Sequence, residues 1–378
     1  MKLIHLSDLH LGKRVNEFSM LEDQKYILLE ILRIIEEEKP DGVIIAGDVY
    51  DKSVPSAEAV KLLDEFQYRL AKLGQQVYMI SGNHDSPERI AFGGRLLDVS
   101  GIHLSPVFEG DITPCTLEKN GEEIKIWMLP FVKPADVRHV YPEEEIPDYT
   151  AAVKTVIDHM EINPDEINVL VAHQFVTGAA RSESEDVSVG GMDNVNAAVF
   201  DAFDYVALGH IHGPQHIGRE TIRYCGTPLK YSFSEKDHVK SVTVVTLGTK
   251  GETTVRTVPL KPRREMREIR GKYGDLILKE SYEGTDTDDY LHVILTDEED
   301  VPDALNKLRL VYPHIMKLDY DNTRTRSSAE IDAIQGAEEK SGLELFEEFY
   351  TLQNGQHMSD EQKAFVKDLL ESLEEEKA

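Results

Sequence analysis

Apolar runs with abrupt ends divide the first hundred residues of the chain into alternating strands and helices. Three short runs predict strands, over Lys2–Leu6, Gly42–Ala46 and Val77–Ile80. Two longer stretches repeat apolar residues at helical spacing and predict helices, over Leu21–Glu38 and Ala57–Leu73. The middle strand has no polar alternation, which is typical of a sheet covered on both faces. This order of elements predicts an α/β fold.

The pattern changes further along the chain. More strands are expected over Asn168–Ala172, Tyr205–Leu208, Ser241–Leu247 and Thr253–Pro259. After Pro262, a β-α-β unit is expected, with strands over Tyr290–Leu295 and His314–Tyr320 and a helix over Pro302–Val311. The pattern becomes helical and acidic from about Ser328, and residues 329–378 contain 14 acids and 4 lysines. We therefore expect a small second domain followed by a helical tail.

Five of the expected strands end in residues that can bind a metal ion. These residues are Asp8, His10, Asp48, Asn83, His173, His210 and His212. Open α/β sheets bind ligands at the carboxyl edge of their strands, so we expect these side chains to meet. Asp8 and His10 point the same way if their backbone stays extended, because a strand has a period of two. The polar loop Arg181–Val189 is expected to border this site or a partner.

The strand ends supply oxygen and imidazole ligands without a thiolate, which suits Mn²⁺ or Fe²⁺ better than Zn²⁺ or Mg²⁺. For a single histidine, a hydrogen-bonded place in or near the core is the commoner explanation, and we expect it for His5 and His216. Chance is a poor explanation for five strands that all end in such ligands. Seven ligands exceed what one ion takes, and Asp48 can bridge two ions. The pattern therefore predicts a two-metal site for phosphoryl transfer.

The loop Asn83–Asp85 joins a strand to a helix. Ser86 is a favoured helix N-cap and Pro87 suits the first helical position. On such a loop His84 can move a proton, and Asp85 can orient and charge that histidine. The loop therefore combines a metal ligand with groups for acid–base chemistry.

The composition of the chain indicates the class of protein that carries this site. The chain has 378 residues, 40% of them hydrophobic, and no apolar run of the roughly 20 residues that span a membrane. The first residues lack the pattern of a signal peptide. Cys115 and Cys225 form no metal or disulfide motif, which fits a reducing cytosol. The net charge of −29 argues against holding nucleic acid by bulk electrostatics.

Three longer stretches carry a family resemblance, namely His5–Gly12, Ser188–Gly191 and Gly226–Ser234. With the ordered strand-end ligands, they make the chain similar to the calcineurin-like metallophosphoesterases and, among these, to the SbcD family of bacterial exonuclease subunits. The resemblance covers essentially the whole chain. It implies a two-sheet sandwich flanked by helices over 1–262, a small α+β capping domain over 263–327 and a helical, partner-binding segment over 328–378.

The family pattern implies a role for each residue of the site. One Mn²⁺ would be held by Asp8, His10, Asp48 and His212, and the other by Asp48, Asn83, His173 and His210. Mg²⁺ or Fe²⁺ are possible substitutes. His84 would be the general acid that protonates the leaving 3′ oxygen, with Asp85 hydrogen-bonded behind it.

The resemblance also implies partners. The family works with SbcC, a coiled-coil ATPase that uses the ATP, and the pair acts as an ATP-dependent double-strand exonuclease and a single-strand endonuclease in DNA repair and recombination. A homodimer within a heterotetramer is expected, in the bacterial cytoplasm at the nucleoid. Lys13, Arg14 and Arg89 lie on loops beside ligand strands and are the expected DNA contacts.

The acidic tail contains a candidate surface for the ATPase. Ser359–Gln362 fits a capping box, and an apolar stripe follows it, made by Phe365, Val366, Leu369, Leu370 and Leu373. Such a stripe either packs on its own domain or binds a partner. The resemblance favours binding to SbcC.

Other functions of the superfamily are the alternatives. A phosphomonoesterase or a cyclic-nucleotide phosphodiesterase shares the metal chemistry. Phosphoprotein phosphatases resemble Gly-Asp-x-x-Asp-Arg-Gly and Gly-Asn-His-Glu, whereas here Lys52 and Ser53 follow Asp51, and Asp85 stands in place of the Glu. A non-catalytic scaffold for an ATPase tolerates missing ligands, and none of the family's ligands is missing.

Overall fold

The computed structural model describes residues 1–185 and 193–323, together with ten residues nearer the C-terminus: Thr325, Phe346, Glu347, Tyr350, Met358, Ser359, Gln362, Lys363, Phe365 and Val366. By its contacts the chain divides into two units. The first comprises Met1–Glu268 and Asp288–His292, and the second comprises Ile269–Thr287 and Val293–Ala378.

The first sheet contains six strands in the order β16-β15-β1-β4-β5-β6. Their bounds are Lys2–Leu6 (β1), Gly42–Ala46 (β4), Gln76–Ile80 (β5), Ile102–Leu104 (β6), Ser241–Leu247 (β15) and Thr253–Pro259 (β16). Strands β1, β4, β5 and β6 are parallel, and β15 runs antiparallel to both β1 and β16. The predicted β-α-β-α-β start is confirmed, and the parallel strands bring their carboxyl ends to one edge.

The second sheet has the order β13-β14-β12-β9-β8-β7. Its strands are Cys115–Lys119 (β7), Glu122–Leu129 (β8), Ile167–His173 (β9), Tyr205–Gly209 (β12), Gln215–Ile217 (β13) and Arg219–Tyr224 (β14). Of these, only β9 and β12 were predicted with bounds. The β7–β8 hairpin turns at Asn120 and Gly121, both with positive φ, and Asn-Gly is the usual signal for such a turn.

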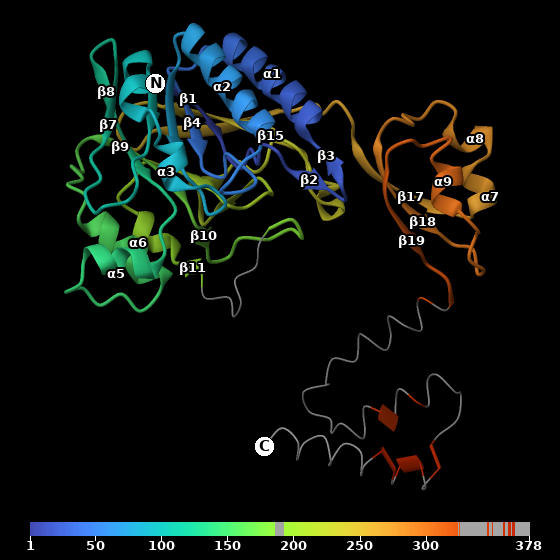
Figure 1. The fold of residues 1–378 in the computed structure, drawn as a ribbon. Coiled ribbons are helices and arrows are strands. Elements are labelled where there is room, and N and C mark those ends of the chain that lie inside the picture. Colours follow the sequence, from blue (N-terminus) through green and yellow to red (C-terminus); the bar gives the residue numbers. More distant parts are fainter. Residues whose placement is uncertain are drawn as a thin grey trace. The chain divides into compact units, whose positions relative to one another are not determined.

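The two sheets pack face to face over an apolar core. Ile44, Ala46 and Ile80 of the first sheet belong to the same buried cluster as Val169 and Val171 of the second. Alternate residues of β4 point away from this core. On that side, helices α1 (Leu21–Glu38) and α2 (Ala57–Lys72) lie side by side over the first sheet (Figure 1). The predicted doubly covered sheet and the two-sheet sandwich are confirmed.

The outer face of the second sheet is covered by α5 (Pro134–Val140) and α6 (Tyr149–Asp158). Val153 and Val156 of α6 lie in one buried cluster with Trp127 and Leu170 of the sheet. The indole N–H of Trp127 donates to Asn168 at 2.9 Å, so its polar edge is satisfied inside the core. Neither helix was predicted.

Short helices follow the site strand β5. Ser86 caps α3 (Pro87–Ile90) as predicted, since its hydroxyl accepts from the Arg89 N–H, but the helix has only four residues. It is followed by α4 (Gly94–Leu97) and a 3₁₀ turn, η1 (Asp98–Ser100).

The chain after Pro262 contains a three-stranded sheet in the order β17-β18-β19. Its strands are Met266–Gly271 (β17), Tyr290–Leu295 (β18) and Ile315–Tyr320 (β19), accompanied by α7 (Tyr273–Leu276), α8 (Lys279–Tyr282) and α9 (Ala304–Leu308). Strand β18 was predicted with the same bounds. Helix α9 is shorter than the predicted helix, because Asp303 before it takes a left-handed backbone with φ of 56°. Strand β17 is rich in charged residues and was not predicted.

In the tail, the predicted capping box is present. The Ser359 N–H donates to the Gln362 side chain at 2.8 Å, and the Gln362 N–H donates back to the Ser359 hydroxyl at 3.3 Å. Phe365 is 69% exposed and Val366 is buried. The other members of the stripe, Leu369, Leu370 and Leu373, lie outside the described residues. Among the described residues, no helix is long and apolar enough to cross a membrane.

Candidate metal centre

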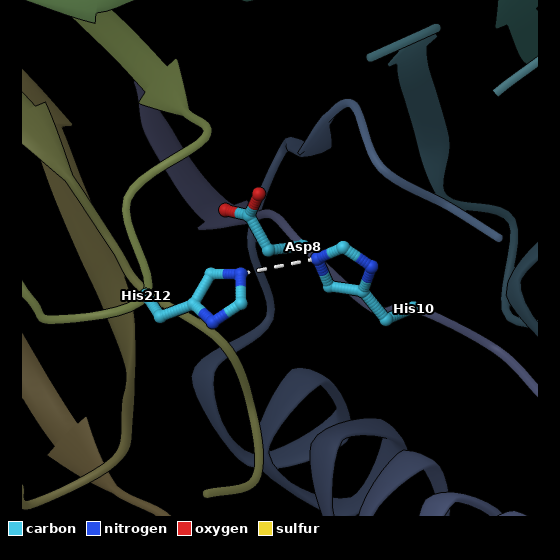
Figure 2. A group of neighbouring side chains, drawn as sticks. All are labelled: Asp8, His10 and His212. Carbon is cyan, nitrogen blue, oxygen red and sulfur yellow. Dashed lines mark hydrogen bonds between the residues drawn. The ribbon is translucent and has the colours of Figure 1, made fainter. Parts of the chain in front are cut away.

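The seven predicted ligands gather where five strands of the two sheets end. Asp8 and His10 follow β1, Asp48 follows β4, Asn83 follows β5, His173 ends β9, and His210 and His212 follow β12. Within the described part of the chain, three groups of side chains place their donor atoms within 4.8 Å of one another: Asp8, His10 and His212; Asp8, Asp48 and His173; and His10, Asp48 and His84. Figure 2 shows the first group.

Asp48 lies at the centre of these groups. Its Oδ2 atom is 3.3 Å from Nε2 of His173 and 3.7 Å from Nε2 of His10. On the side of Asp48 where Asp8 lies, Nε2 of His10 is 3.2 Å from Nε2 of His212 (Figure 2). The two rings therefore present nitrogen atoms to the same point, beside Asp8.

Asn83 organises the other side. Its Oδ1 atom is 2.9 Å from Nε2 of His173 and 2.9 Å from Nδ1 of His210. The ring of His173 is fixed from behind, because its Nδ1 donates to the backbone carbonyl of Ala46 at 2.8 Å. That bond leaves Nε2 of His173 to face Asp48 and Asn83, as a metal ligand needs.

Several ligands have an unusual backbone. Among the described residues, nine non-glycine residues have positive φ, and four of them are Asp8 (53°), His10 (44°), Asp48 (46°) and His210 (103°). The backbone of the Asp8-x-His10 segment is therefore not extended, so the condition for its side chains to align by strand period is not met. The chain turns sharply after each strand, and this turn brings Asp8 and His10 together. Non-glycine residues held in this way cluster at functional sites.

Two glycines allow the loops to approach closely. A Cβ atom on Gly82 would lie 2.1 Å from Oδ1 of Asp48, and one on Gly209 would lie 1.9 Å from the carbonyl oxygen of Ala46. Any side chain at these positions would push the β5 or β12 loop away from the β4 loop. Gly82 is therefore required by the contact between two loops of the first sheet, and Gly209 by the contact between the two sheets.

The electrostatics of the site favour a bound cation. Burial raises the pKa of Asp48, but the rings of His173, His10 and His84 outweigh it and hold that pKa well below its usual range. Burial lowers the pKa of His173, but the Asp48 carboxylate raises it to about 9. Burial raises the pKa of Asp8 to about 6, with a further contribution from Asp48. Two buried carboxylates thus lie side by side and draw positive charge towards them.

Two other ligands are held as neutral imidazoles. Burial lowers the pKa of His10 well below its usual value, and it lowers the pKa of His210 to about 3. Neutral imidazole is the form that binds metal ions. Carboxylate, amide and imidazole donors directed at common points therefore fit divalent metal ions of the Mn²⁺ type.

His84 and Asp85 are placed differently from one another. The His84 ring is partly exposed, its Nδ1 is 3.2 Å from the carbonyl of Asp51, and its backbone N–H donates to Oδ1 of Asp48 at 2.9 Å. The prediction that the His84 ring donates a hydrogen bond to Asp85 is wrong. Asp85 is buried and accepts instead from the backbone N–H groups of Gly82, Val49 and Tyr50 at 2.9–3.0 Å. Asp85 therefore ties the β4 and β5 loops together.

The predicted DNA contacts do not share one environment. Lys13 is largely covered, forms an ion pair with Asp51 at 2.8 Å and lies over the Tyr231 ring. Arg14 is exposed on the short strand β2 (Arg14–Val15), and Arg89 is exposed on α3. Of the three predicted DNA contacts, only Arg14 and Arg89 are thus exposed to solvent.

His5 and His216, the two histidines expected in or near the core, differ as well. His5 is buried, as predicted, with Nδ1 2.8 Å from the Tyr205 hydroxyl. The prediction for His216 is wrong, because it is exposed on β13 and pairs with Glu220 at 3.2 Å.

Sequence reasoning missed several residues that support the ligands. The described part of the predicted loop, residues 181–185, is the acidic loop that borders the site as predicted, since Ser184 and Glu185 both contact His212. Glu235 and Lys240 form a buried ion pair and were not singled out from the sequence. Gln24 of α1 donates to the His10 carbonyl at 2.7 Å and was predicted only as part of a helix. The sole signal for Gln24 is a polar residue among the apolar positions of that helix.

Comparisons with known proteins show the family of the chain. Residues 1–214 match the family model of the calcineurin-like phosphoesterases, and residues 262–354 match that of the type 5 capsule protein repressor C-terminal domain. The SbcD subunit of the nuclease SbcCD from Staphylococcus epidermidis is 34% identical over 377 residues, which is 98% of each chain.

Solved structures show weaker similarity. A dimetal phosphatase from Danio rerio is 12% identical, with a TM-score of 0.43, over 69% of this chain and 96% of that one. The NAD nucleotidase of Haemophilus influenzae is 12% identical, with a TM-score of 0.38, over 93% and 70%. Both likenesses are too weak to bear on the function of this chain.

The central place of Asp48 leads to a prediction about metal content. Asp48→Ala should lose both ions, because its carboxylate faces both groups of ligands, whereas His10→Ala should weaken mainly one. Metal analysis after dialysis against Mn²⁺ measures this, with the exposed His216→Ala as a control that keeps both ions. Equal metal content in the Asp48 and His10 variants would contradict a bridging Asp48.

Proposed function

We propose that this chain, which belongs to the SbcD family of calcineurin-like phosphoesterases, is the nuclease subunit of an SbcCD-type complex and hydrolyses DNA phosphodiester bonds at a two-metal site. The observation that carries the proposal is that Asp48 and the other six predicted ligands gather at one edge of the two sheets. The similarity to a named nuclease subunit along 98% of the chain supports DNA as the substrate. In this role the chain acts in DNA repair and recombination.

The proposed ligand sets follow the two sides of the site. Asp8, His10, Asp48 and His212 hold one ion, and Asp48, Asn83, His173 and His210 hold the other. When bound, two such ions supply Lewis-acid chemistry that stabilises charge on the attacking and leaving oxygens of a phosphoryl transfer. The mixed oxygen and imidazole donors make Mn²⁺ the proposed metal.

His84 is proposed as the general acid. Its backbone is fixed to Asp48, and Nδ1 faces the carbonyl of Asp51. An imidazolium that donates Nδ1–H to this carbonyl keeps its Nε2 proton for transfer to the leaving 3′ oxygen. The partial exposure of the ring is consistent with access to a substrate. Asp85 contributes by holding the loop rather than by contacting the ring.

His84→Gln tests the proposed reaction. Mn²⁺-dependent cleavage of duplex and single-stranded DNA should fall by about two to four orders of magnitude, which is the usual contribution of a general acid. Both ions should remain bound. The wild-type chain, assayed with a phosphomonoester in parallel, reports whether DNA is the preferred substrate.

Two results would count against this assignment. Loss of an ion from the His84 variant would make His84 a ligand, a role that its closeness to His10 and Asp48 permits. Faster hydrolysis of the monoester than of DNA by the wild-type chain would contradict the nuclease proposal.

The tail is proposed to bind the coiled-coil ATPase SbcC. Phe365 exposes 69% of its surface, although it begins an apolar stripe that includes Leu369, Leu370 and Leu373. An aromatic side chain in this position is available to a partner. The match to the C-terminal family model ends at residue 354, before the stripe begins. ATP is then used by the partner and not by this chain.

Truncation after Asn354 tests the role of the tail. Mn²⁺-dependent hydrolysis of a small phosphodiester should remain, because the ligands all precede residue 213. Copurification with SbcC and ATP-dependent processing of long duplex DNA should be lost. If the truncated chain instead melts at a lower temperature and still binds SbcC, the stripe packs on its own domain.

A homodimer is also proposed, through an apolar ridge formed by Phe92, Leu96 and Val99. These side chains are 80–89% exposed, with Phe92 in the turn between α3 and α4, Leu96 on α4 and Val99 on η1. Three large apolar side chains this exposed within one short segment are typical of an interaction surface.

Leu96→Glu tests the apolar ridge. It should convert a dimer to a monomer in analytical ultracentrifugation, because a carboxylate is costly to bury. Leu310→Glu is the matched control, since Leu310 is 87% exposed but lies outside the ridge. A wild-type chain that is monomeric, or a Leu96 variant that remains dimeric, would contradict this proposal.

A further inference from the structure

His212 is held at every polar group except one ring nitrogen. Its backbone N–H donates to Glu185 at 2.7 Å, and its carbonyl accepts from Nζ of Lys240 at 2.8 Å. Its Nδ1 atom is 2.6 Å from the hydroxyl oxygen of Ser184. Only Nε2 is left, and it faces Nε2 of His10 in the candidate metal site (Figure 2). The protein thus fixes both the backbone and the ring of this ligand.

A buried ion pair lies behind the Ser184 hydroxyl. Glu235 is fully buried, and one of its carboxylate oxygens accepts from Ser184. The other oxygen accepts from Nζ of Lys240 at 2.5 Å. Lys240 is 4% exposed and also donates to the hydroxyl of Thr227 at 2.7 Å. With its bond to the His212 carbonyl, all three donors of the ammonium group are used.

These contacts set the direction of each hydrogen bond. A carboxylate that is paired with an ammonium group accepts hydrogen bonds and donates none. The Ser184 hydroxyl must therefore give its hydrogen to Glu235, so its oxygen is left to accept from Nδ1–H of His212. The proton of the neutral ring is then on Nδ1, and the lone pair is on Nε2.

We propose that Ser184 and Glu235 are positioning residues, which lock His212 in the one tautomer that presents an Nε2 lone pair to the metal. The inference rests on the proposed metal site and adds to it two residues that are not ligands. An unrestrained neutral imidazole exchanges its proton between the two nitrogens and turns about its side-chain bonds. The lock removes both freedoms before the metal arrives.

The intervening hydroxyl distinguishes this arrangement from an ordinary structural ion pair. Nδ1 of His212 is 3.5 Å from the nearest oxygen of Glu235, which is too long for a good direct hydrogen bond. Ser184 closes that gap from the acidic loop that follows β10 (Phe175–Val176). Through Ser184, the loop therefore connects His212 to Glu235, which is 23 residues further along the chain.

Manganese titration of the full chain tests this inference, with free Mn²⁺ followed by electron paramagnetic resonance. Ser184→Ala and Glu235→Gln should each weaken one of the two Mn²⁺ sites by about 10–100-fold, which is the usual loss when the partner of a metal-bound histidine is removed. The second site should keep its affinity. Ser184→Thr restores a hydroxyl and should recover most of the loss.

Ser182→Ala is the matched control. Ser182 lies on the same loop and contacts the same oxygen of Glu235 at 3.4 Å, but it bonds to Glu185 and Ser184 rather than to the His212 ring. This variant should bind both ions like the wild-type chain. Metal-free melting curves separate positioning from folding, and Ser184→Ala should melt close to the wild-type temperature.

Each other outcome overturns the inference. Unchanged affinity at both sites in Ser184→Ala would show that the hydroxyl does not position His212. Equal weakening of both sites with a lower metal-free melting temperature would show a structural role alone. Failure of the wild-type chain to bind Mn²⁺ would overturn the proposed metal site itself. If the wild-type chain binds two ions, the metal site stands, and the Ser184 result then decides only the positioning role.

Discussion

A buried carboxylate is the constraint around which the site is built. Asp48 is 2% exposed, and an isolated carboxylate in such a place costs several kcal/mol. The chain compensates with imidazole rings from the ends of three other strands and with the backbone N–H of His84. One of those rings, His173, comes from the second sheet. The need to neutralise Asp48 thus joins the two halves of the sandwich at one edge.

This junction determines the local backbone. The loops after β4, β5 and β12 approach so closely that Gly82 and Gly209 have no room for a side chain. Asp8, His10 and Asp48 take positive φ so that each side chain turns inward directly after its strand. Such conformations cost free energy, of order 1–3 kcal/mol each, and they persist because the surrounding hydrogen bonds determine them. The loops are therefore specified by mutual contact and not by local propensity.

The sequence predicted the parts that depend on local pattern. Strand β4 and helix α1 have the predicted bounds, because continuous apolar runs and helical periodicity with clear stops need no tertiary information. The ligands could be found because each directly follows an apolar strand.

The sequence could not predict features that depend on contacts distant in the chain. The backbone of Asp8 is left-handed because the loop hydrogen-bonds to the β4 loop, with the Asp8 N–H donating to the Gly47 carbonyl at 3.0 Å. The partners of Asp85 are backbone groups, which no side-chain pattern reveals. Glu235 and Lys240 could not be singled out, because an ion pair becomes buried only through packing. Strand β17 was hidden by its charges, since only one of its six residues is buried.

Among the many acidic residues of the chain, those nearest the site have the largest effect on what binds there. A net charge of −29 repels DNA at long range, but salt screens exposed charges over roughly 8–10 Å, so the charges near the site decide what binds there. Asp8 and Asp48 place two carboxylates at its centre, and without metal they repel a phosphodiester. In the proposed holo form, two divalent cations reverse that sign. Metal loading then controls substrate binding as well as chemistry, and the lock on His212 matters because it prepares one of the ligands on which that reversal depends.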